Sequence, residues 1–208
     1  MNFTSGISIK KLWSDAPFTT IMALINVLIF LIQVIFEQMK GYPYIETLGA
    51  IQKTLVFEYG EYYRIFTSAF LHADILHLLF NVGFGLLIIT SFLERKLGTL
   101  RTVIIYFTTL LLSGLAVAGL SPVNVWTLGA SGAIFGVLGA MLWMSFFRRD
   151  LLTDHDIRSI RTLIIYNVVI TLLISNISNV GHFSGLVAGF LVAFLFIPRD
   201  KAEYEIYH

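Results

Sequence analysis

The chain has 208 residues, of which 57% are apolar and 13% are charged, and its mean hydropathy is +0.81. A water-soluble domain carries about 25% charged residues, so this composition leaves too little charge to cover an aqueous surface and excludes such a domain. The net charge of +1 gives no case for a nucleic-acid partner, and the absence of cysteine excludes disulfides and thiolate metal sites.

Six apolar runs follow one another along the chain, and each is a candidate membrane-spanning helix. They are residues 18–36, 75–93, 103–120, 130–147, 163–177 and 183–197. About 20 residues cross the hydrocarbon core as a helix, and the lack of polar–apolar alternation argues against a membrane β-barrel. We therefore expect an all-α polytopic membrane protein with one six-transmembrane-helix domain at 18–197, a cytoplasmic N-terminal segment at 1–17 and a cytoplasmic C-terminal tail at 198–208.

Lysine and arginine are unevenly divided between the two sides of such a six-span chain. One side holds Lys10, Lys11, Arg95, Lys96, Arg101, Arg148, Arg149, Arg158, Arg161, Arg199 and Lys201, and the other side holds Lys40, Lys53 and Arg64. Cytoplasmic loops of membrane proteins carry the excess of lysine and arginine. Both termini are therefore expected in the cytoplasm, in an integral multi-pass protein of a bacterial cytoplasmic membrane.

The connection between the first two runs, residues 40–71, has five tyrosines but no run long enough to cross a bilayer. Aromatic side chains with one apolar and one polar end favour the headgroup zone. A segment of this composition is typical of an element that lies in the plane of the membrane surface. We therefore expect an interfacial first loop.

Two polar residues stand near the start of the second run. His77 and Asn81 are four residues apart and share one face of a helix. An imidazole and an amide aimed at one point can stabilise an oxyanion. A purely structural pair, bonded across helices, is the simpler alternative. A metal site formed by His72, Asp74, His77 and His182 is disfavoured, because no two histidines have the HExxH spacing; no metal and no cofactor are expected.

Ser131 opens the fourth run within the sequence GASG at 129–132. A serine that merely caps its helix is the ordinary alternative. Gly129 and Gly132, however, allow a substrate backbone to approach the hydroxyl, and we assign them to substrate stabilisation. Gly132, Gly136 and Ala140 form a small-residue face at four-residue spacing, which permits close helix–helix packing. The uncharged connections at 121–129 and 178–181 suggest that this helix and the sixth begin below the headgroups.

His182 opens the sixth run beside a second small-residue face of Gly181, Gly185 and Gly189. Two such faces can pack backbone to backbone and bring Ser131 and His182 to the same depth. Ionisable residues buried in a membrane mark function by default, although a structural histidine is the alternative. No carboxylate lies in apolar sequence near His182, so we expect a dyad in which His182 is the general base for Ser131.

The serine motif, the glycine-flanked histidine and the run from His72 to Asn81 together resemble the rhomboid family of intramembrane serine proteases, over residues 62–196. The resemblance implies that Ser131 is the nucleophile, His182 the base, and His77 and Asn81 the oxyanion-stabilising side chains, together with the backbone amide of Ser131. It makes His72 a structural residue. It also implies a six-helix core that opens to the extracytoplasmic side and substrates that are transmembrane proteins in the lipid bilayer. The oligomeric state is left open.

Two positions depart from the pattern of that family. The turn at 94–98 resembles the Glu-x-Arg-x-Gly turn of the family but has Lys96 in place of the arginine. Lysine cannot form a bidentate fork, so a looser turn is expected. Phe135 stands where family members often have a tyrosine against the catalytic histidine. Stacking on His182 is expected to persist, without a phenolic hydrogen bond.

Two other functions remain open at this point. A noncatalytic relative of the family would bind transmembrane clients without cleaving them. A small transporter would use the buried polar residues as an ion path; half-sequence repeats would favour it, and none is found. Asn167 in the fifth run fits a substrate gate or a proton path less well than a helix–helix hydrogen bond.

Overall fold

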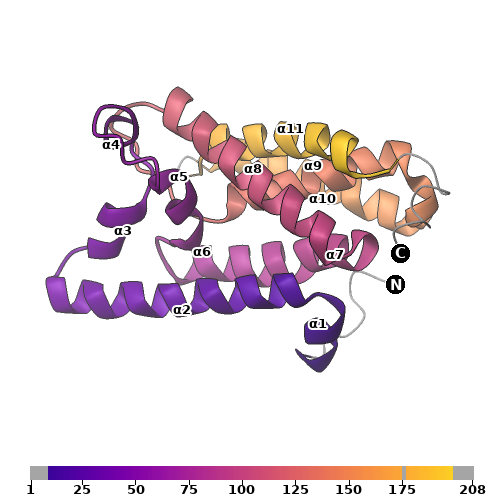
Figure 1. Cartoon of the computed structure of the whole chain (residues 1–208), viewed down its shortest axis with the longest axis horizontal. Coiled ribbons are helices and arrows are strands. Elements are labelled where there is room, and N and C mark those ends of the chain that lie inside the picture. The colour runs from indigo at the N-terminus through magenta and orange to yellow at the C-terminus, as the bar shows by residue number, and fades with distance from the viewer. Residues whose placement is uncertain (1–8, 175–176, 199–208) are drawn as a thin grey trace.

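Long helices lie side by side in the computed structural model, which describes residues 9–174 and 177–198; α3, α4 and α5 gather at one end of them, and α1 lies at the other end (Figure 1). The long helices are α2 (Pro17–Lys40), α8 (Thr99–Leu120), α9 (Ser131–Phe147), α10 (Asp154–Leu173), α11 (Asn179–Phe196) and a composite of α6 (Ile75–Leu79), η2 (Phe80–Thr90) and α7 (Ser91–Leu97). The short ones are α1 (Ile9–Asp15), α3 (Tyr44–Gly49), α4 (Lys53–Phe57), α5 (Arg64–Thr67), η1 (Ser68–Phe70) and η3 (Arg149–Leu151). The expected all-α class is confirmed.

Four helices of the described chain are long and apolar enough to cross a membrane. They are Pro17–Lys40, Ile75–Leu97, Thr99–Leu120 and Asn179–Phe196. The apolar α9 has 17 residues, and α10 begins with charged residues. The count of six spans therefore stays a prediction. So do the two predicted terminal segments, because residues 1–8 and 199–208 lie outside the described part.

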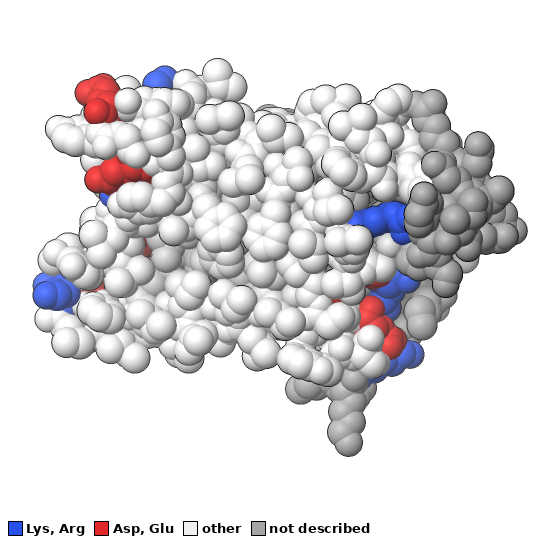
Figure 2. All heavy atoms as spheres, viewed as in Figure 1, with Lys and Arg blue, Asp and Glu red and all other residues white. Residues whose placement is uncertain are grey.

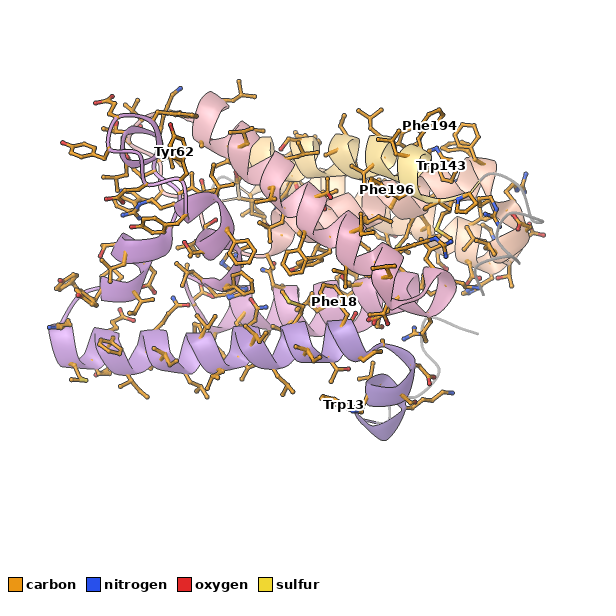
Figure 3. The ribbon with its side chains drawn as sticks, viewed as in Figure 1. Trp13, Phe18, Tyr62, Trp143, Phe194 and Phe196 are labelled. Carbon is orange, nitrogen blue, oxygen red and sulfur yellow. The ribbon has the colours of Figure 1, made fainter. Side chains whose placement is uncertain are left out.

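Charged side chains gather at the two ends of the face seen in Figure 2, and the broad band between them has none. Tyr62 lies at the end with α3, α4 and α5 and Trp13 at the other end (Figure 3), and both are more than half exposed. Aromatic side chains mark the two interfaces of membrane proteins. The uncharged band between them is the surface suited to the lipid hydrocarbon.

The helix that begins at Ser131, α9, lies at the centre of the bundle in contact with α8, α10, α11 and η2. Its Leu138 and Trp143 are buried in one core together with Leu86 of η2 and Tyr106 of α8. A helix that is apolar on all sides is expected in such an enclosed place. The central position of α9 fixes where Ser131 stands.

The second predicted run forms a composite helix and not the uniform α-helix that its hydropathy suggests. Between α6 and α7 the backbone is a π-helix over Phe80–Thr90. The hydroxyl of Thr90 donates to the carbonyl of Gly85, five residues back, at 2.9 Å. A π-helix is rare and often lies near a functional site. Here it directly follows His77, so the local widening of the helix sits next to a candidate site residue.

A buried carboxylate connects the end of the composite helix to the start of α2. The side chain of Glu94, 2% exposed, accepts hydrogen bonds from the backbone N–H groups of Phe18 and Thr19, each at 2.9 Å. Unpaired N–H groups and a positive dipole at a helix start favour a carboxylate there. From the same turn Lys96 donates to the carbonyl of Leu151 at 2.8 Å. The turn at 94–98 thus binds two other parts of the chain.

The fifth predicted run, 163–177, forms the second half of a longer helix. α10 begins at Asp154, nine residues earlier, because a polar helical extension precedes the apolar part. Thr153 and Asp156 cap this start reciprocally. The described helix ends at Leu173, and residues 175–176 of the predicted run lie outside the described part. The amide of Asn167 donates within its own helix, to Leu163 at 2.8 Å, so the expected helix–helix bond is wrong.

Candidate active site

The backbones of α9 and α11 touch at glycine positions. A Cβ atom added to Gly185 would overlap the carbonyl oxygen of Gly132, and one added to Gly189 would overlap that of Gly136. Such direct approach is what small residues at four-residue spacing permit. We call these four glycines, with Gly139, the glycine seam. The seam holds the first turns of the helices that carry Ser131 and His182 in contact.

One member of the seam differs from the prediction. Gly139 makes a third close contact outside the predicted stripe, because a Cβ atom added to it would overlap the carbonyl oxygen of Leu186. Ala140 is fully buried in the core. The predicted four-residue stripe treats the helices as parallel rows, whereas crossing helices move the contact line to a neighbouring residue.

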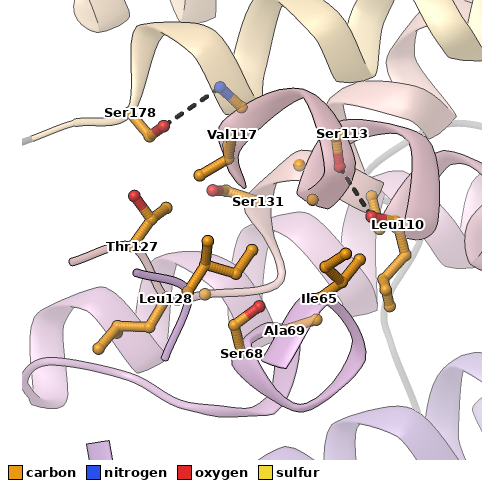
Figure 4. A pocket seen from close by; sticks show the side chains of 16 residues that line it. Ile65, Ser68, Ala69, Leu110, Ser113, Val117, Thr127, Leu128, Ser131 and Ser178 are labelled. Atoms are coloured by element: carbon orange, nitrogen blue, oxygen red, sulfur yellow. Dashed lines mark hydrogen bonds between the residues drawn. The ribbon is translucent and has the colours of Figure 1, made fainter. Parts of the chain in front are cut away.

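Ser131 is the first residue of α9 and does not cap it. Ala130 occupies the N-cap position, and no side chain bonds the first turn there. In the described part of the chain the Ser131 hydroxyl has no hydrogen-bond partner, and none joins it to His182. The hydroxyl is half-buried and lines a cavity (Figure 4). The ordinary N-cap interpretation is therefore wrong, because Ala130 holds that position.

His182 lies in the first turn of α11 and is 8% exposed. Its ring stacks on Phe135 of α9, with centroids 3.9 Å apart and planes inclined by 18°. This is the stacking expected when phenylalanine replaces tyrosine. On the other side, its Nδ1 lies 2.8 Å from the hydroxyl oxygen of Thr171, in α10. Thr171 is a site residue that the sequence does not single out, because one threonine in an apolar run carries no distinctive signal.

His77 approaches the serine motif through Gly129. The φ angle of Gly129 is +117°, and a Cβ added there would lie 2.7 Å from Nε2 of His77. Only glycine combines that backbone conformation with so close a neighbour. Nδ1 of His77 faces the backbone N–H of Ala73 at 3.4 Å. When one ring nitrogen of a neutral histidine accepts a hydrogen bond, the ring hydrogen is on the other nitrogen. Nε2–H is therefore available as a donor beside Gly129.

The side chain of Asn81 is buried but points its amide at its own helix. Its Nδ2 donates to the backbone carbonyl of His77 at 2.9 Å, and the residue is 5% exposed. The amide nitrogen of Asn81 thus bonds within its own helix, and the oxyanion role of Asn81 stays a prediction. The site places His77 against Gly129 and stacks His182 on Phe135, one helical turn after Ser131 in α9.

His72 lies immediately before the second predicted span and is fully buried. Gln33 of α2 holds its backbone from both sides, accepting from its N–H and donating to its carbonyl, each at 3.1 Å. Burial, reinforced by the charge of His77, lowers the pKa of His72 to about 3. Its ring stands edge-on to that of His77, with centroids 5.1 Å apart. Neutral His72 therefore packs against the ring of His77 and restricts its position.

The cavity beside Ser131 has a volume of about 30 Å³, enough for a water molecule or a small side chain. Five hydroxyl residues, including Ser131, and a set of glycine and aliphatic residues line it (Figure 4). The lining residues are Ile51, Ile65, Ser68, Ala69, Leu110, Ser113, Gly114, Val117, Thr127, Leu128, Gly129, Gly132, Ala133, Ser178 and Gly181, together with Ser131. The wall thus combines α8, the first loop and both helix starts of the site.

A buried arginine organises the first loop above this cavity. Arg64, 3% exposed, donates to the carbonyls of Thr47 and Ala50 at 3.0 and 2.9 Å. It also pairs with Glu61 at 2.5 Å, and this hydrogen bond lowers the pKa of Glu61. The guanidinium lies 5.9 Å from the ring of Trp126, in the connection that leads to Ser131. Arg64 therefore fixes the loop that supplies one side of the cavity.

No three histidine, cysteine, aspartate or glutamate side chains of residues 9–174 and 177–198 lie together as metal ligands. The alternative of a metal site at His72, Asp74, His77 and His182 thus has no support in the arrangement of these residues. The groups that the site offers for chemistry are a hydroxyl, imidazoles and backbone amides.

Comparison with known proteins gives a consistent result. Residues 59–199 match the family model described as "Rhomboid domain". The chain is 34% identical over 145 residues to YdcA of Bacillus subtilis (strain 168), named as a candidate rhomboid protease, which covers 70% of this chain and 72% of that protein. It is also 34% identical over 179 residues to Rhomboid protease GluP of the same bacterium, covering 85% of this chain but 34% of that protein.

A third relative has a different kind of name. Inactive rhomboid protein 1 of Danio rerio is 34% identical over 142 residues, which are 66% of this chain and 16% of that protein. The relatives therefore include proteins named as proteases and one named as inactive. Their names alone do not decide between catalysis and binding, so the decision must come from the site itself.

Proposed function

The chain belongs to the rhomboid family, and on that basis we propose that it is an intramembrane serine endopeptidase. It hydrolyses peptide bonds in or near the transmembrane helices of other membrane proteins. Ser131 is the nucleophile and His182 the general base. The observation that carries this proposal is the glycine seam, which holds the two helix starts so close that no Cβ fits between them.

In the proposed reaction, Oγ of Ser131 attacks the scissile carbonyl carbon while Nε2 of His182 takes the hydroxyl proton. The oxyanion accepts hydrogen bonds from the backbone N–H of Ser131 and from Nε2–H of His77, which stands across Gly129. The imidazolium then gives its proton to the leaving amine as the C–N bond breaks. Water repeats the sequence on the serine ester and releases the second product.

Two features of the site must change when substrate binds. Catalytic hydrogen bonds are often long or absent in a free enzyme and form only with substrate bound. The proposed Ser131–His182 bond belongs to this class. Asn81 contributes to the oxyanion site only after its amide releases the carbonyl of His77. Until then His77 and the Ser131 amide carry that role.

The cavity beside Ser131 suits a small side chain next to the scissile bond. The cavity of about 30 Å³ is small, so we propose that it favours the side chain of alanine or serine over that of leucine or phenylalanine. The substrate helix must also unwind locally, because an intact helix hides its carbonyls in internal hydrogen bonds. We therefore propose substrates with small residues in a weakly helical stretch.

We place the protein in a bacterial cytoplasmic membrane with six spans and both termini in the cytoplasm. Lys96 and Arg148 belong to the end of the bundle opposite α3, α4 and α5, where the sequence concentrates positive charge. α3, α4, α5 and the cavity then face the extracytoplasmic side. In this orientation α9 and α10 complete the count of six.

Labelling with a fluorescent fluorophosphonate, together with cleavage of a labelled transmembrane substrate, tests the proposal. Purified wild type should label and cleave, whereas Ser131→Ala and His182→Ala should lose cleavage by roughly a thousandfold or more. Equal product from wild type and Ser131→Ala would overturn the protease proposal. Label that persists in Ser131→Ala would place the nucleophile elsewhere.

The same preparation distinguishes the rival functions. Wild type that binds the transmembrane substrate without labelling or cleaving would be a noncatalytic client binder; the Danio rerio relative is named as inactive. A substrate series with alanine, serine, leucine or phenylalanine before the scissile bond tests the size of the pocket. Equal cleavage of all four would contradict the proposed small-residue preference.

A further inference from the structure

Thr171 is the only buried residue in the second half of α10, residues 165–173. It is 1% exposed, whereas Ile165 and Leu173 are 61% and 78% exposed. A hydroxyl that is withdrawn into an apolar environment requires a hydrogen-bond partner. The partner is His182, because its Nδ1 lies 2.8 Å from Oγ1 of Thr171. This half of α10 therefore touches the site through one polar contact.

The contact restricts how His182 can hold its proton. A neutral imidazole has one N–H and one lone pair, and the bond made by one nitrogen decides the role of the other. Phe135 covers one face of the ring but leaves both nitrogens free to bond. Thr171 engages Nδ1, so Nε2 is the nitrogen left for chemistry. No carboxylate side chain bonds His182 within the described residues.

We propose that Thr171 is a positioning residue for His182, in that its hydroxyl oxygen accepts the Nδ1 hydrogen and keeps the Nε2 lone pair available for the proton of Ser131. This assignment rests on the proposed function. The same bond persists when the ring becomes an imidazolium, where a charged donor strengthens it. A neutral hydroxyl does this without placing a second charge in the membrane, where an ion pair is costly to bury.

Three variants separate positioning from packing. Thr171→Val keeps the shape of the side chain but removes the acceptor, Thr171→Ser keeps the acceptor, and Thr162→Val changes an exposed threonine of the same helix as a matched control. We expect Thr171→Val to lower kcat roughly fivefold to tenfold with KM nearly unchanged, as for the loss of one neutral hydrogen bond. Thr171→Ser should recover to within about twofold of wild type, and Thr162→Val should match wild type.

Nuclear magnetic resonance of protein labelled with ¹⁵N-histidine reads the bond without relying on activity. The chain has five histidines, and the signal missing from His182→Ala identifies His182. Wild type and Thr171→Ser should show the Nδ1–H tautomer, and Thr171→Val should shift toward Nε2–H. An unchanged tautomer in Thr171→Val, or a Thr171→Ser variant as slow as Thr171→Val, would overturn the assignment. If wild type shows the tautomer but never cleaves, the proposed function fails and the hydrogen bond stands.

Discussion

Two neighbours of His182, the α9–α11 interface at the glycine seam and the second half of α10, are attached to the bundle in different ways. In the seam, backbone lies on backbone, and Phe135 stacks on the ring from within a fully packed core. In residues 165–173 of α10 most apolar side chains are exposed, Val168 is half-buried against the core, and Thr171 alone is buried. The seam is held by close backbone packing, whereas this segment combines sparse apolar packing with one hydrogen bond.

The difference indicates a division of labour between the two regions. A close-packed interface is either in contact or separated, because its atoms already fill the space between the helices and leave no room for gradual adjustment. A segment with few buried apolar contacts opens at a lower cost in free energy than a closely packed one. The seam is therefore suited to holding the nucleophile and base in register. The first half of α10 is packed into the core through Ile160 and Ile164, so its sparsely packed second half is the part that we expect to yield first.

The largest effect is expected from filling the seam. Gly189→Ala would drive a methyl group into the carbonyl of Gly136, so the helices must separate. We expect a loss of about 3 kcal/mol or more of unfolding free energy and no detectable cleavage. Gly119→Ala is the matched control, because an added Cβ there meets nothing within 4 Å. Thermal unfolding in detergent and substrate cleavage measure both variants; an active, stable Gly189→Ala protein would contradict the rigid seam.

A smaller effect is expected at the start of α10. Burial acts to raise the pKa of Asp156, but hydrogen bonds with Thr153 and the charge of Lys96 outweigh it and hold that pKa below 3.8. A carboxyl whose pKa is lower in the folded state stabilises the fold above its unfolded pKa. This stabilisation is lost as the pH falls below 3.8 and through the lower native pKa. Asp156→Asn should lower the melting temperature at about pH 6.

The control for this prediction is the pH series itself. The melting temperatures of wild type and Asp156→Asn should converge as the pH falls below 3.8, whereas labelling of Ser131 at about pH 6 should be nearly equal in the two proteins. A capping interaction contributes about 1 kcal/mol, so the shift is a few degrees. A gap between the two melting curves that stays constant down to the lowest pH would show that Asp156 acts through something other than its charge.

The smallest effect is expected at Asn167, which lies between Asp156 and Thr171 in α10. Its amide bonds a carbonyl of its own helix, to Leu163, and supports no contact between helices. Asn167→Leu should change the unfolding free energy by no more than about 0.5 kcal/mol and leave the cleavage rate near that of wild type. A rate that falls tenfold in the substrate assay would place Asn167 on the path of the substrate.

Much of the arrangement follows from patterns that the sequence displays directly. Small residues at four-residue spacing predict the seam, because close backbone contact needs them and little else does. Gly185 and Gly189 were identified on this ground with their partner helix. Continuous hydropathy likewise predicts the helical class and the positions of the long helices. These features depend on residues near one another in the chain.

The features that the sequence leaves hidden depend on how distant segments meet. Thr171 becomes a site residue only because α10 and α11 bring its hydroxyl to His182. Asn81 shares a helix face with His77, yet its amide donates to the backbone carbonyl of His77. This local hydrogen bond competes with a hydrogen bond from the same amide to a bound oxyanion. The π-helix of η2 has no hydropathy signal, because its hydrogen-bond register is set by packing against α2 and α9.

The π-helix at Phe80–Thr90 separates two contacts of the composite helix. Both contacts form only if the two side chains keep a fixed relative direction about the helix axis. Before it, His77 faces Gly129; after it, Glu94 caps the start of α2. Each residue of a helix turns the chain by roughly a quarter of a circle. Removing one residue from η2 would swing His77 away from the serine motif while Glu94 stayed in place. The number of residues in this segment therefore determines the orientation of His77 relative to Glu94.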